Sequence, residues 1–463
     1  MTDTIAAIST PLGSGGIGVI RISGPEAIDV ASGLFGRKKT GPTDCRSLES
    51  HRVYHGYIFD PDRRQSGMDI IDEVLLIPML APSSYTAEDV VEIQAHSGTI
   101  VLRSVLDLVL SMGVRMAEPG EFTKRAFLNQ RIDLTQAEAV TDIINARSNA
   151  SLKFAASQNM GALKERIQAL TEPLVDILAH VEASIDFPDE TDAFQPGSNE
   201  IEAIRRIVDR CNELIQQHND ACFLKDGIRV SICGAPNVGK SSLMNRLVNQ
   251  EKSIVTALPG TTRDPIQEGL NLNGVPFVIC DTAGIHKTDD LVEIIGIEKA
   301  KDHINQSDLV LWVTEPLSTL NPDHIRSMVP ESKNTILVLN KSDLLDTEGS
   351  YRFPEALNQL PRARVSALHN HGVDELKEIM INLSIKELDL ERSSVIPNLR
   401  HKKALQRAVK ELETARQSMI DHIDHEMLAI DIKNALDALG MITGETAQLD
   451  ILDTIFSNFC IGK

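Results

Sequence analysis

Short apolar runs separated by glycine, proline and serine clusters are the main feature of the first 118 residues. Runs rich in β-branched residues predict strands, because alternate side chains of a strand face opposite sides of a sheet. We expect strands at 4–10, 18–23, 73–79 and 89–96. One longer stretch, 98–113, repeats its apolar residues with the period of a helix. Together these patterns predict an α+β domain over residues 1–118.

The pattern changes after Pro119, where apolar residues begin to recur every three to four positions. This spacing is typical of helices that bury one face. It predicts helical structure at 135–187, 199–222, 400–423, 427–444 and 448–459. Residues 228–384, between these segments, instead alternate strand-like and helix-like stretches, which is the signature of an α/β domain.

We therefore expect a multidomain chain in which an α/β domain is inserted into an all-α helical domain. The helical domain would be built from the segments on both sides of the insertion. The expected boundaries are 1–118 for the α+β domain, 119–223 for the first helical part, 224–384 for the α/β domain and 385–463 for the second helical part.

Composition limits the possible functions without naming one. The chain has 463 residues, 42% of them hydrophobic, and about three domains fit that length. No apolar run approaches the roughly 20 residues that span a bilayer, and the N-terminus lacks a signal-peptide pattern. With six scattered cysteines, these features predict a cytoplasmic protein with reduced thiols. The net charge of −20 means that any RNA contact needs a local basic patch or a basic partner.

The strongest chemical signal is a glycine-rich segment between an apolar strand and a helix. The segment RVSICGAPNVGKSSLMNRL has Gly234, Gly239, Lys240 and Ser241 at the spacing of a P-loop. Backbone N–H groups in such a loop bind phosphates, aided by the N-terminus of the helix that follows. We expect Lys240 at the outer phosphates and Ser241 on Mg²⁺. The strand–loop–helix context argues against a chance match.

Two further segments fit the phosphate side of a GTPase site. GTTRD (260–264) offers Thr262 as a second magnesium ligand. CDTAG (280–284) would place Asp281 in the outer shell of the magnesium ion and Gly284 at the γ-phosphate.

The base is expected to bind between NKSD (340–343) and SAL (366–368). Asp343 can accept hydrogen bonds from both the N1–H and the exocyclic amine of guanine. Adenine lacks that pair of donors and would leave the carboxylate unpaired, so the sequence favours GTP over ATP.

Three positions bear on hydrolysis. Ile285 stands directly after DTAG, where many GTPases carry a glutamine that orients water, so another group must do this. Asn237, inside the P-loop, can offer a neutral oxygen to a monovalent cation. Glu293 is a candidate for orienting water, although from the residues alone a solvated helix carboxylate is the simpler interpretation.

The chain ends in NFCIGK (458–463), directly after a helical pattern. Prenylation of Cys460 is disfavoured because Gly462 and Lys463 do not fit the C-a-a-X box. The residues alone leave two alternatives, a frayed terminus and a tail that docks in a site.

Over its whole length the chain resembles the MnmE/TrmE family, the GTPases that modify the wobble uridine of tRNA. The resemblance rests on the GTPase motifs and on DTIAAISTPLGSGGIGVIRISG, EDVVEIQAHSG, PGEFTKRAFLNQRIDLTQAEA, VEASIDFPDE and the terminal CIGK. It implies a folate-binding N-terminal domain that also forms a homodimer, and a Ras-like GTP hydrolase domain that potassium activates. It further implies a flavin-containing MnmG-type partner, with which the family forms a heterotetramer. Together they would install an aminomethyl or carboxymethylaminomethyl group at uridine C5 from a one-carbon tetrahydrofolate.

The resemblance also implies roles for single residues. Potassium would be bound at Asn237, Thr256, Leu258 and Thr261, and Glu293 would organise the hydrolytic water. Folate would contact Arg21, Glu92, Arg131 and Lys463, with Cys460 placed near the one-carbon group. The full set expected to bind GTP is Asn237, Val238, Gly239, Lys240, Ser241, Ser242, Thr256, Ala257, Leu258, Pro259, Gly260, Thr261, Thr262, Asp281, Thr282, Ala283, Gly284, Asn340, Lys341, Asp343, Ser366, Ala367 and Leu368.

Two other functions stay open at this point. Era-like ribosome-assembly GTPases share this style of P-loop, although a KH module with its GxxG is not found here. Alternatively, the protein is a GTP-driven conformational scaffold whose partner performs the chemistry. A basic stretch at 400–410 is either a tRNA or partner contact or a solvated helix face.

Overall fold

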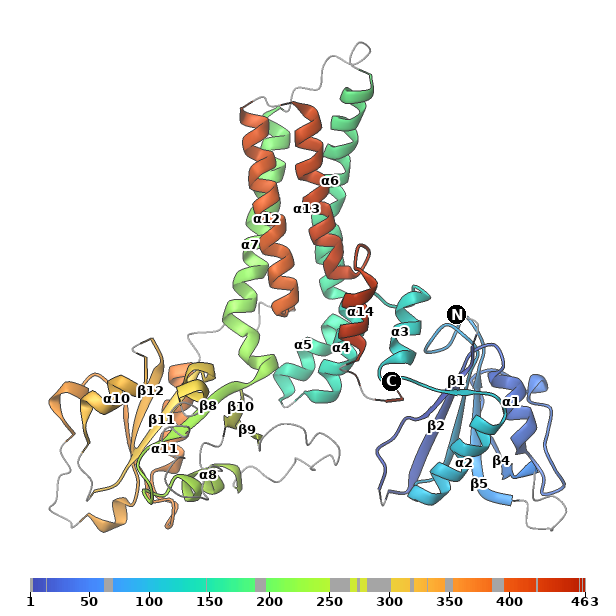
Figure 1. Ribbon diagram of the computed structural model, residues 1–463, viewed down its shortest axis with the longest axis horizontal. Coiled ribbons are helices and arrows are strands. Elements are labelled where there is room, and N and C mark those ends of the chain that lie inside the picture. Colours follow the sequence, from blue (N-terminus) through green and yellow to red (C-terminus); the bar gives the residue numbers. More distant parts are fainter. Residues whose placement is uncertain are drawn as a thin grey trace, which may run out of the picture. The chain divides into compact units, whose positions relative to one another are not determined.

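The computed structural model describes the chain from residue 3 onward, apart from 14, 62–69, 147, 188–196, 250–266, 273–274, 281–300, 317–319, 331, 346–352, 385–394, 422–423, 458, 460 and 463. The chain divides into two compact units (Figure 1). The first unit contains Met1–Thr141, Gln158–Arg205 and Arg407–Lys463, and the second contains Asp142–Ser157 and Arg206–Gln406.

The first unit holds a seven-stranded sheet in the order β3-β4-β5-β6-β2-β1-β7. Its strands are β1 Ile5–Ile8, β2 Ile17–Ser23, β3 Phe35–Gly36, β4 Tyr54–Phe59, β5 Ile70–Met79, β6 Val90–His96 and β7 Arg115–Met116. All neighbouring pairs are antiparallel except β1 and β7. The four predicted strands and the predicted helix are confirmed, whereas strands β3, β4 and β7 were not predicted.

Helices α1 (Ala27–Leu34) and α2 (Thr99–Ser111) cover one face of this sheet. Ile20 and Ile22 of β2 point into that core, as do Val91 and Ile93 of β6. Because side chains alternate along a strand, the residues between them lie on the opposite face. Arg21 and Glu92 are such residues, and the antiparallel register of β2 and β6 places them directly opposite each other.

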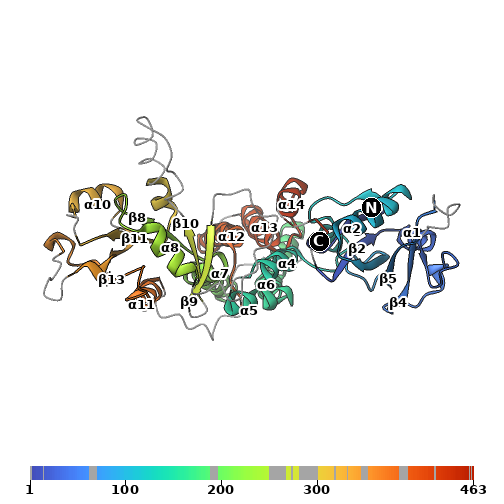
Figure 2. The same ribbon diagram turned by 90° about the horizontal axis from the view of Figure 1, so that it is seen from below.

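The helical part of the first unit contains α3 (Glu121–Leu128), α6 (Ala162–Asp186), α13 (His425–Thr443) and α14 (Leu449–Phe456). It also contains most of α4 (Leu134–Asn145), whose residues after Thr141 belong to the second unit. Helices α6 and α13 lie side by side (Figures 1 and 2). Leu163, Ile167, Leu170 and Leu174 form a buried stripe on α6, at the spacing that presents one face to a neighbour. The helical stretch predicted at 135–187 consists of three helices, α4, α5 (Asn149–Asn159) and α6, and the chain turns between α5 and α6 at Gly161, which has φ +96°.

The second unit holds a six-stranded sheet in the order β13-β12-β11-β8-β10-β9, in which only β9 is antiparallel to its neighbour. The strands are β8 Ile228–Cys233, β9 Gln267–Leu272, β10 Val275–Cys280, β11 Leu309–Thr314, β12 Asn334–Leu339 and β13 Arg362–Arg364. Strand β11 is buried along its whole length, as expected for a parallel strand covered on both faces.

Helices α8 (Lys240–Asn249) and α11 (Val373–Ser384) pack on one face of this sheet, and α10 (Pro322–Met328) packs on the other (Figure 2). Helices α7 (Ser198–Asp226) and α12 (Leu399–Ile420) precede and follow the inserted α/β segment in the sequence. This arrangement confirms the predicted fold class, an α+β domain, a helical domain and an inserted α/β domain with a P-loop. In the part of the chain that is described, no helix has the length and apolar character needed to cross a bilayer.

Candidate functional site

The P-loop connects strand β8 to helix α8, and its backbone is held in conformations that favour glycine. Gly234 has φ +142° and lies against the backbone of Val313 on β11, so a side chain there would collide. Gly239 has φ +91° and lies against the side-chain amide of Asn340. Asn237 is also left-handed, with φ +64°. The loop is therefore pressed closely against the ends of neighbouring strands.

Lys240 opens α8, and its ammonium group lies over the loop. Its Nζ donates to the carbonyl oxygens of Gly234 at 3.0 Å and of Ala235 at 2.8 Å. Ser241 and Ser242 follow in the first turn of the helix and are exposed. The N-terminus of a helix of this length, together with an ammonium group, suits the oxygens of a phosphate chain.

Asn340, at the end of β12, connects the P-loop to the loop that contains SAL. Its side chain is only 2% exposed. Its Nδ2 donates to the carbonyl of Val238 at 2.9 Å, and its Oδ1 accepts from the Ala367 amide at 3.1 Å. The side chain of Asn340 thus joins the P-loop, 102 positions earlier in the sequence, to the SAL loop, 27 positions later.

Lys341 links the base side of the site to the middle of the P-loop. Its Nζ donates to the carbonyl of Asn237 at 2.8 Å and to the Glu315 carboxylate at 2.5 Å. Glu315 follows β11 and was not predicted from the sequence, where nothing marks it as close to NKSD. This carboxylate orients the lysine by a charge-assisted hydrogen bond.

Asp343 lies in a short 3₁₀ turn, Ser342–Leu344, and faces the SAL loop. The hydroxyl of Ser366 donates to its Oδ1 at 2.5 Å. That hydrogen bond lowers the pKa of Asp343, and the nearby His369 acts in the same direction. The carboxylate is therefore kept ionised, the form that accepts two donors from a guanine edge.

Arg246, near the end of α8, is a further residue of this region that the sequence did not single out. Its Nε donates to the carbonyl of Ala367 at 3.0 Å, and its Nη2 donates to the carbonyl of Leu368 at 3.0 Å. The predicted residues Thr256, Ala257, Leu258, Pro259, Gly260, Thr261, Thr262, Asp281, Thr282, Ala283, Gly284 and Glu293 lie outside the described residues, as does Ile285.

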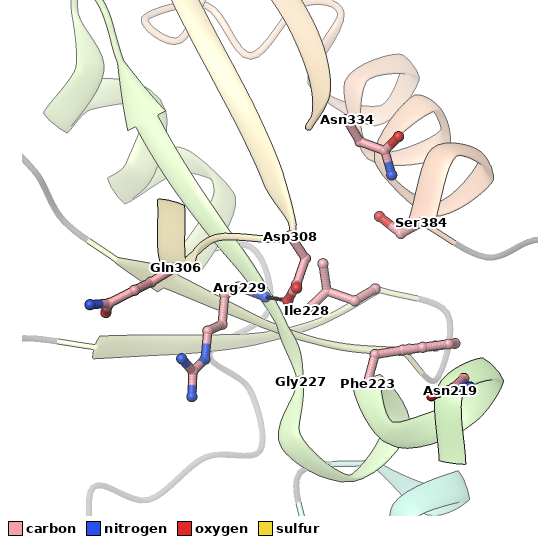
Figure 3. A pocket seen from close by; sticks show the side chains of 9 residues that line it. All are labelled: Asn219, Phe223, Gly227, Ile228, Arg229, Gln306, Asp308, Asn334 and Ser384. Atoms are coloured by element: carbon pink, nitrogen blue, oxygen red, sulfur yellow. Dashed lines mark hydrogen bonds between the residues drawn. The ribbon is translucent and has the colours of Figure 1, made fainter. Parts of the chain in front are cut away.

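A separate cavity of about 340 Å³ lies near the starts of β8 and β12 and the end of α11 (Figure 3). Asp308 accepts a hydrogen bond from the Arg229 amide there at 2.9 Å. Its lining residues are Asn219, Phe223, Gly227, Ile228, Arg229, Gln306, Asp308, Asn334 and Ser384. None of these was predicted to bind a ligand.

A second group of predicted residues meets on the open face of the N-terminal sheet. Arg21 and Glu92 form an ion pair, with Nε and Nη2 of Arg21 at 2.9 and 2.8 Å from Oε1 of Glu92. The Arg21 guanidinium also lies 5.1 Å from the ring centre of Tyr85 and 5.6 Å from that of Phe122. Cation–π contacts of this kind favour a fixed orientation of the arginine.

Tyr85 is the common neighbour of both predicted arginines. The Arg131 guanidinium lies 5.2 Å from the centre of its ring and donates to its carbonyl oxygen at 2.9 Å. The Tyr85 hydroxyl is 2.9 Å from Oγ1 of Thr123. Tyr85 was not predicted as a site residue, because an aromatic residue in a Pro- and Ser-rich loop gives no pattern that distinguishes it.

The loop that carries Tyr85 is held by α3 and the residues just after it. Arg125 is fully buried and donates to Glu88 at 3.1 Å and to Glu121 at 3.0 Å. Asn129 donates to the carbonyl of Thr86 at 2.7 Å. The segment PGEFTKRAFLNQRIDL therefore holds this loop in place, and Thr123 and Arg131 of the segment contact Tyr85 directly.

The end of the chain docks at the same place. Phe459 is buried and packs against Phe456, with ring centres 5.3 Å apart. Gly462 is buried, with φ +88°, and its carbonyl accepts from Oγ of Ser9 at 3.0 Å and from Nη1 of Arg21 at 3.4 Å. Of the two open alternatives, these described residues agree with a docked tail, while Cys460 and Lys463 lie outside the described residues.

Comparisons with known proteins cover the parts of the chain that contain these two groups of residues. A family model described as the MnmE helical domain matches residues 134–460, and one described as the GTP-binding protein TrmE N-terminus matches residues 4–131. The chain is 44% identical over 473 residues to the tRNA modification GTPase MnmE of Carboxydothermus hydrogenoformans, covering 100% of both chains. It is 41% identical over 463 residues to the protein of the same name from Acetivibrio thermocellus, covering 100% of this chain and 99% of the relative.

Among solved structures, the G domain of the FeoB iron transporter of T. maritima is 24% identical, covers 34% of this chain and 98% of its own, and has a TM-score of 0.25. An Era variant of Aquifex aeolicus bound to GDP.AlF4- is 26% identical, covers 40% of this chain and 66% of its own, and has a TM-score of 0.27. The full-length similarity and the two family models are decisive: the chain belongs to the MnmE family of tRNA modification GTPases.

Proposed function

We propose that this protein hydrolyses GTP and, with a flavin-containing MnmG-type partner, modifies C5 of the wobble uridine of tRNA. The contact between Ser366 and Asp343 is the observation that supports guanine as the base. The carboxylate is ionised and oriented, and Asn340 fixes the loop beside it to the P-loop. The full-length similarity to proteins named tRNA modification GTPases supports the assignment to tRNA.

We further propose that Mg²⁺ and K⁺ take part in hydrolysis. Ser241, exposed in the first turn of α8, suits a magnesium ion beside the phosphates, with Thr262 as its second protein ligand. Asn237 is exposed in a left-handed turn of the P-loop, where its side-chain oxygen suits a larger monovalent cation. Thr256, Leu258 and Thr261 would complete the potassium site. Glu293 would orient the water in place of the glutamine that Ile285 replaces.

The N-terminal site suits a one-carbon tetrahydrofolate. The two guanidinium groups can pair with the carboxylates of such a ligand, and Glu92 can accept from the donor edge of a pterin. The ring of Tyr85, held between Arg21 and Arg131, offers an aromatic surface beside these charges. Gly462 places the tail against Arg21, so Cys460 and Lys463 would lie close to the folate.

The proposal includes a homodimer through the N-terminal domain, a heterotetramer with the partner, and action in the cytoplasm. The proposed domains are residues 1–118, the two helical parts 119–223 and 385–463, and the GTPase domain 224–384 between them. Two alternatives differ in what the protein itself contributes. In one, GTP drives a conformational change and the partner performs all the chemistry at uridine. In the other, the protein is a ribosome-assembly GTPase.

Analysis of wobble nucleosides in cells that lack this protein tests the proposed function. We expect the C5 modification to disappear, to return with the wild-type chain, and to stay absent with Asp343→Asn at physiological GTP. Asp343→Asn should instead favour xanthine nucleotides, because an amide supplies the donor that matches their acceptor. Normal wobble modification in the deletion strain, with a defect in ribosome assembly, would instead establish the assembly-factor alternative.

A further inference from the structure

Arg246 joins the phosphate side of the nucleotide site to its base side. Helix α8 begins at Lys240, which lies over the P-loop. Arg246 is six residues further on, so about 9 Å along the helix axis. From there its guanidinium group reaches the carbonyl oxygens of Ala367 and Leu368, both at 3.0 Å. One helix therefore holds a phosphate-binding lysine at its start and a clamp on the SAL loop near its end.

The SAL loop is fixed from two sides. Ser366 and His371 exchange backbone hydrogen bonds of 2.9 and 3.2 Å, which close the loop into a tight turn. On the inner side, Asn340 accepts from the amide of Ala367, and the hydroxyl of Ser366 reaches Asp343. On the outer side, Arg246 is the described residue that donates to two successive carbonyls. Without Arg246, the loop would lose its two outer hydrogen bonds and keep the inner contacts and the backbone pair between Ser366 and His371.

We propose that Arg246 is a positioning residue for guanine recognition, acting through the SAL loop to keep Ser366 on Asp343. This inference rests on the proposed function of the site as a guanine-nucleotide site. A guanidinium group suits this task because its fixed fork can donate to two carbonyls at once, which an ammonium group or an amide cannot do with the same geometry. Since these contacts leave the P-loop untouched, the effect of Arg246 falls on the base and not on the phosphates.

The expected consequence is a loss of base discrimination. Inosine lacks the exocyclic amine of guanine, so the ratio of IDP to GDP dissociation constants reports how well Asp343 is placed. We expect Arg246→Gln to weaken GDP binding about tenfold and to reduce that ratio several-fold, because the removed contacts are charge-assisted hydrogen bonds. Arg246→Lys keeps the charge and one donor, and should lie between Arg246→Gln and the wild type.

Arg326 supplies a matched control in the same domain. It lies on α10, and its Nη2 donates to the carbonyl of Ala356 at 3.2 Å, so it is also an arginine holding a loop. Arg326→Gln removes a guanidinium group that donates to a loop carbonyl, on the face of the sheet opposite to α8 and α11. We expect its dissociation constants for GDP and IDP to equal those of the wild type.

The experiment measures dissociation constants for GDP, IDP and ADP with the full-length variants, together with thermal unfolding without nucleotide. A wild type that binds GDP and ADP equally would overturn the proposed function itself. A wild type that prefers GDP, with an unchanged IDP-to-GDP ratio in Arg246→Gln, would overturn only the role of Arg246. The role of Arg246 would also be overturned if Arg246→Gln lowers the unfolding temperature and weakens the binding of GDP, IDP and ADP by one common factor. That pattern would mean that the substitution destabilises the whole domain.

Discussion

Arg21 of strand β2 donates a hydrogen bond at 3.4 Å to the carbonyl oxygen of Gly462, which lies 441 positions further along the chain. The same arginine is paired with Glu92 and lies against the ring of Tyr85. One guanidinium group thus connects the open face of the sheet, the loop over it and the end of the chain. A ligand that binds these groups would contact elements from both ends of the sequence.

The first prediction concerns the acidic limit of nucleotide binding. The Ser366 hydrogen bond lowers the pKa of Asp343, so the carboxylate stays ionised to lower pH than an ordinary aspartate. Guanine binding should therefore persist as the pH falls, and be lost only when the pH passes through that lowered pKa. Ser366→Ala removes the main cause, so the pKa should rise towards its usual value of about 3.9. Binding of GDP, titrated from about pH 3 to pH 7, should then fail at a higher pH in the variant. If the wild type and Ser366→Ala lose GDP binding at the same pH, Ser366 does not act on this carboxylate.

The second prediction concerns the monovalent cation. Asn237 lies exposed in a left-handed turn of the P-loop, and its carbonyl is already occupied by Lys341, so its side chain remains the group to hold K⁺. A cation helps stabilise charge at the transferring phosphate only if its radius fits the surrounding oxygens. GTP turnover should be high in KCl and low in NaCl at equal ionic strength. Asn237→Ala should reduce the difference between the two salts, whereas equal rates of the wild type in both would exclude a potassium site.

The third prediction concerns the hydrolytic water. Glu293→Ala should leave GTP affinity unchanged and reduce kcat by roughly 10²–10⁴, because a group that orients water acts mainly in the transition state. Single-turnover hydrolysis and an independent measurement of the GTP dissociation constant separate the two effects. A parallel loss of affinity would mean that Glu293 supports the fold of its segment instead.

Candidate residues of the nucleotide site can be predicted from the sequence more readily than the contacts between them. Lys240 and Asp343 stand in motifs whose residue types follow directly from phosphate and guanine chemistry, so they can be read without a structure. Arg246 and Glu315 could not be predicted in this way. The partners of Arg246 are backbone carbonyls and the partner of Glu315 is a lysine, and only the folded sheet brings them together. Tyr85 was missed for the same reason: its neighbours Arg21 and Arg131 are far from it in the sequence.

The fold shows the same division. Long segments with clear periodicity, such as β6 and α13, were predicted within a few residues. Strands β3, β7 and β13 have at most three residues each and form only by pairing with a neighbouring strand. A run that short is too short to show the alternating pattern of apolar and polar residues that predicts a strand. The break between α5 and α6 was missed because Ala- and Leu-rich sequence continues on both sides of Gly161.

The fourth prediction separates two roles of Cys460. Serine is close to cysteine in size but far less nucleophilic at neutral pH, because the reactive form of cysteine is the thiolate. If Cys460 reacts or transfers a proton, Cys460→Ser should bind folate normally and fail to modify tRNA. If the residue only packs, the variant should modify tRNA nearly as well as the wild type. Wobble nucleoside analysis with the purified partner and the full chain distinguishes these outcomes, and GTP turnover serves as the internal control.

The fifth prediction tests the docked tail through its backbone. Gly462 has φ +88°, and a Cβ there would lie 2.6 Å from the carbonyl oxygen of Ile8 and 2.8 Å from Cα of Ser9. Both neighbours are backbone atoms of a strand and its continuation, so they cannot move aside as a flexible side chain would. Gly462→Ala should therefore displace the tail and break the contacts with Ser9 and Arg21.

Gly113 provides the matched control, because it has nearly the same φ, +89°, but no atoms within 4 Å of the position of a Cβ. Gly113→Ala thus carries the same backbone strain without the collision. We expect Gly462→Ala to weaken the binding of a tetrahydrofolate measured by calorimetry, and Gly113→Ala to leave it unchanged. Neither should alter GTP turnover, since the nucleotide site lies in the other compact unit. If Gly462→Ala and the wild type bind the folate equally well, the tail docks without serving the site, and Arg21 acts there with Glu92 and Tyr85 alone.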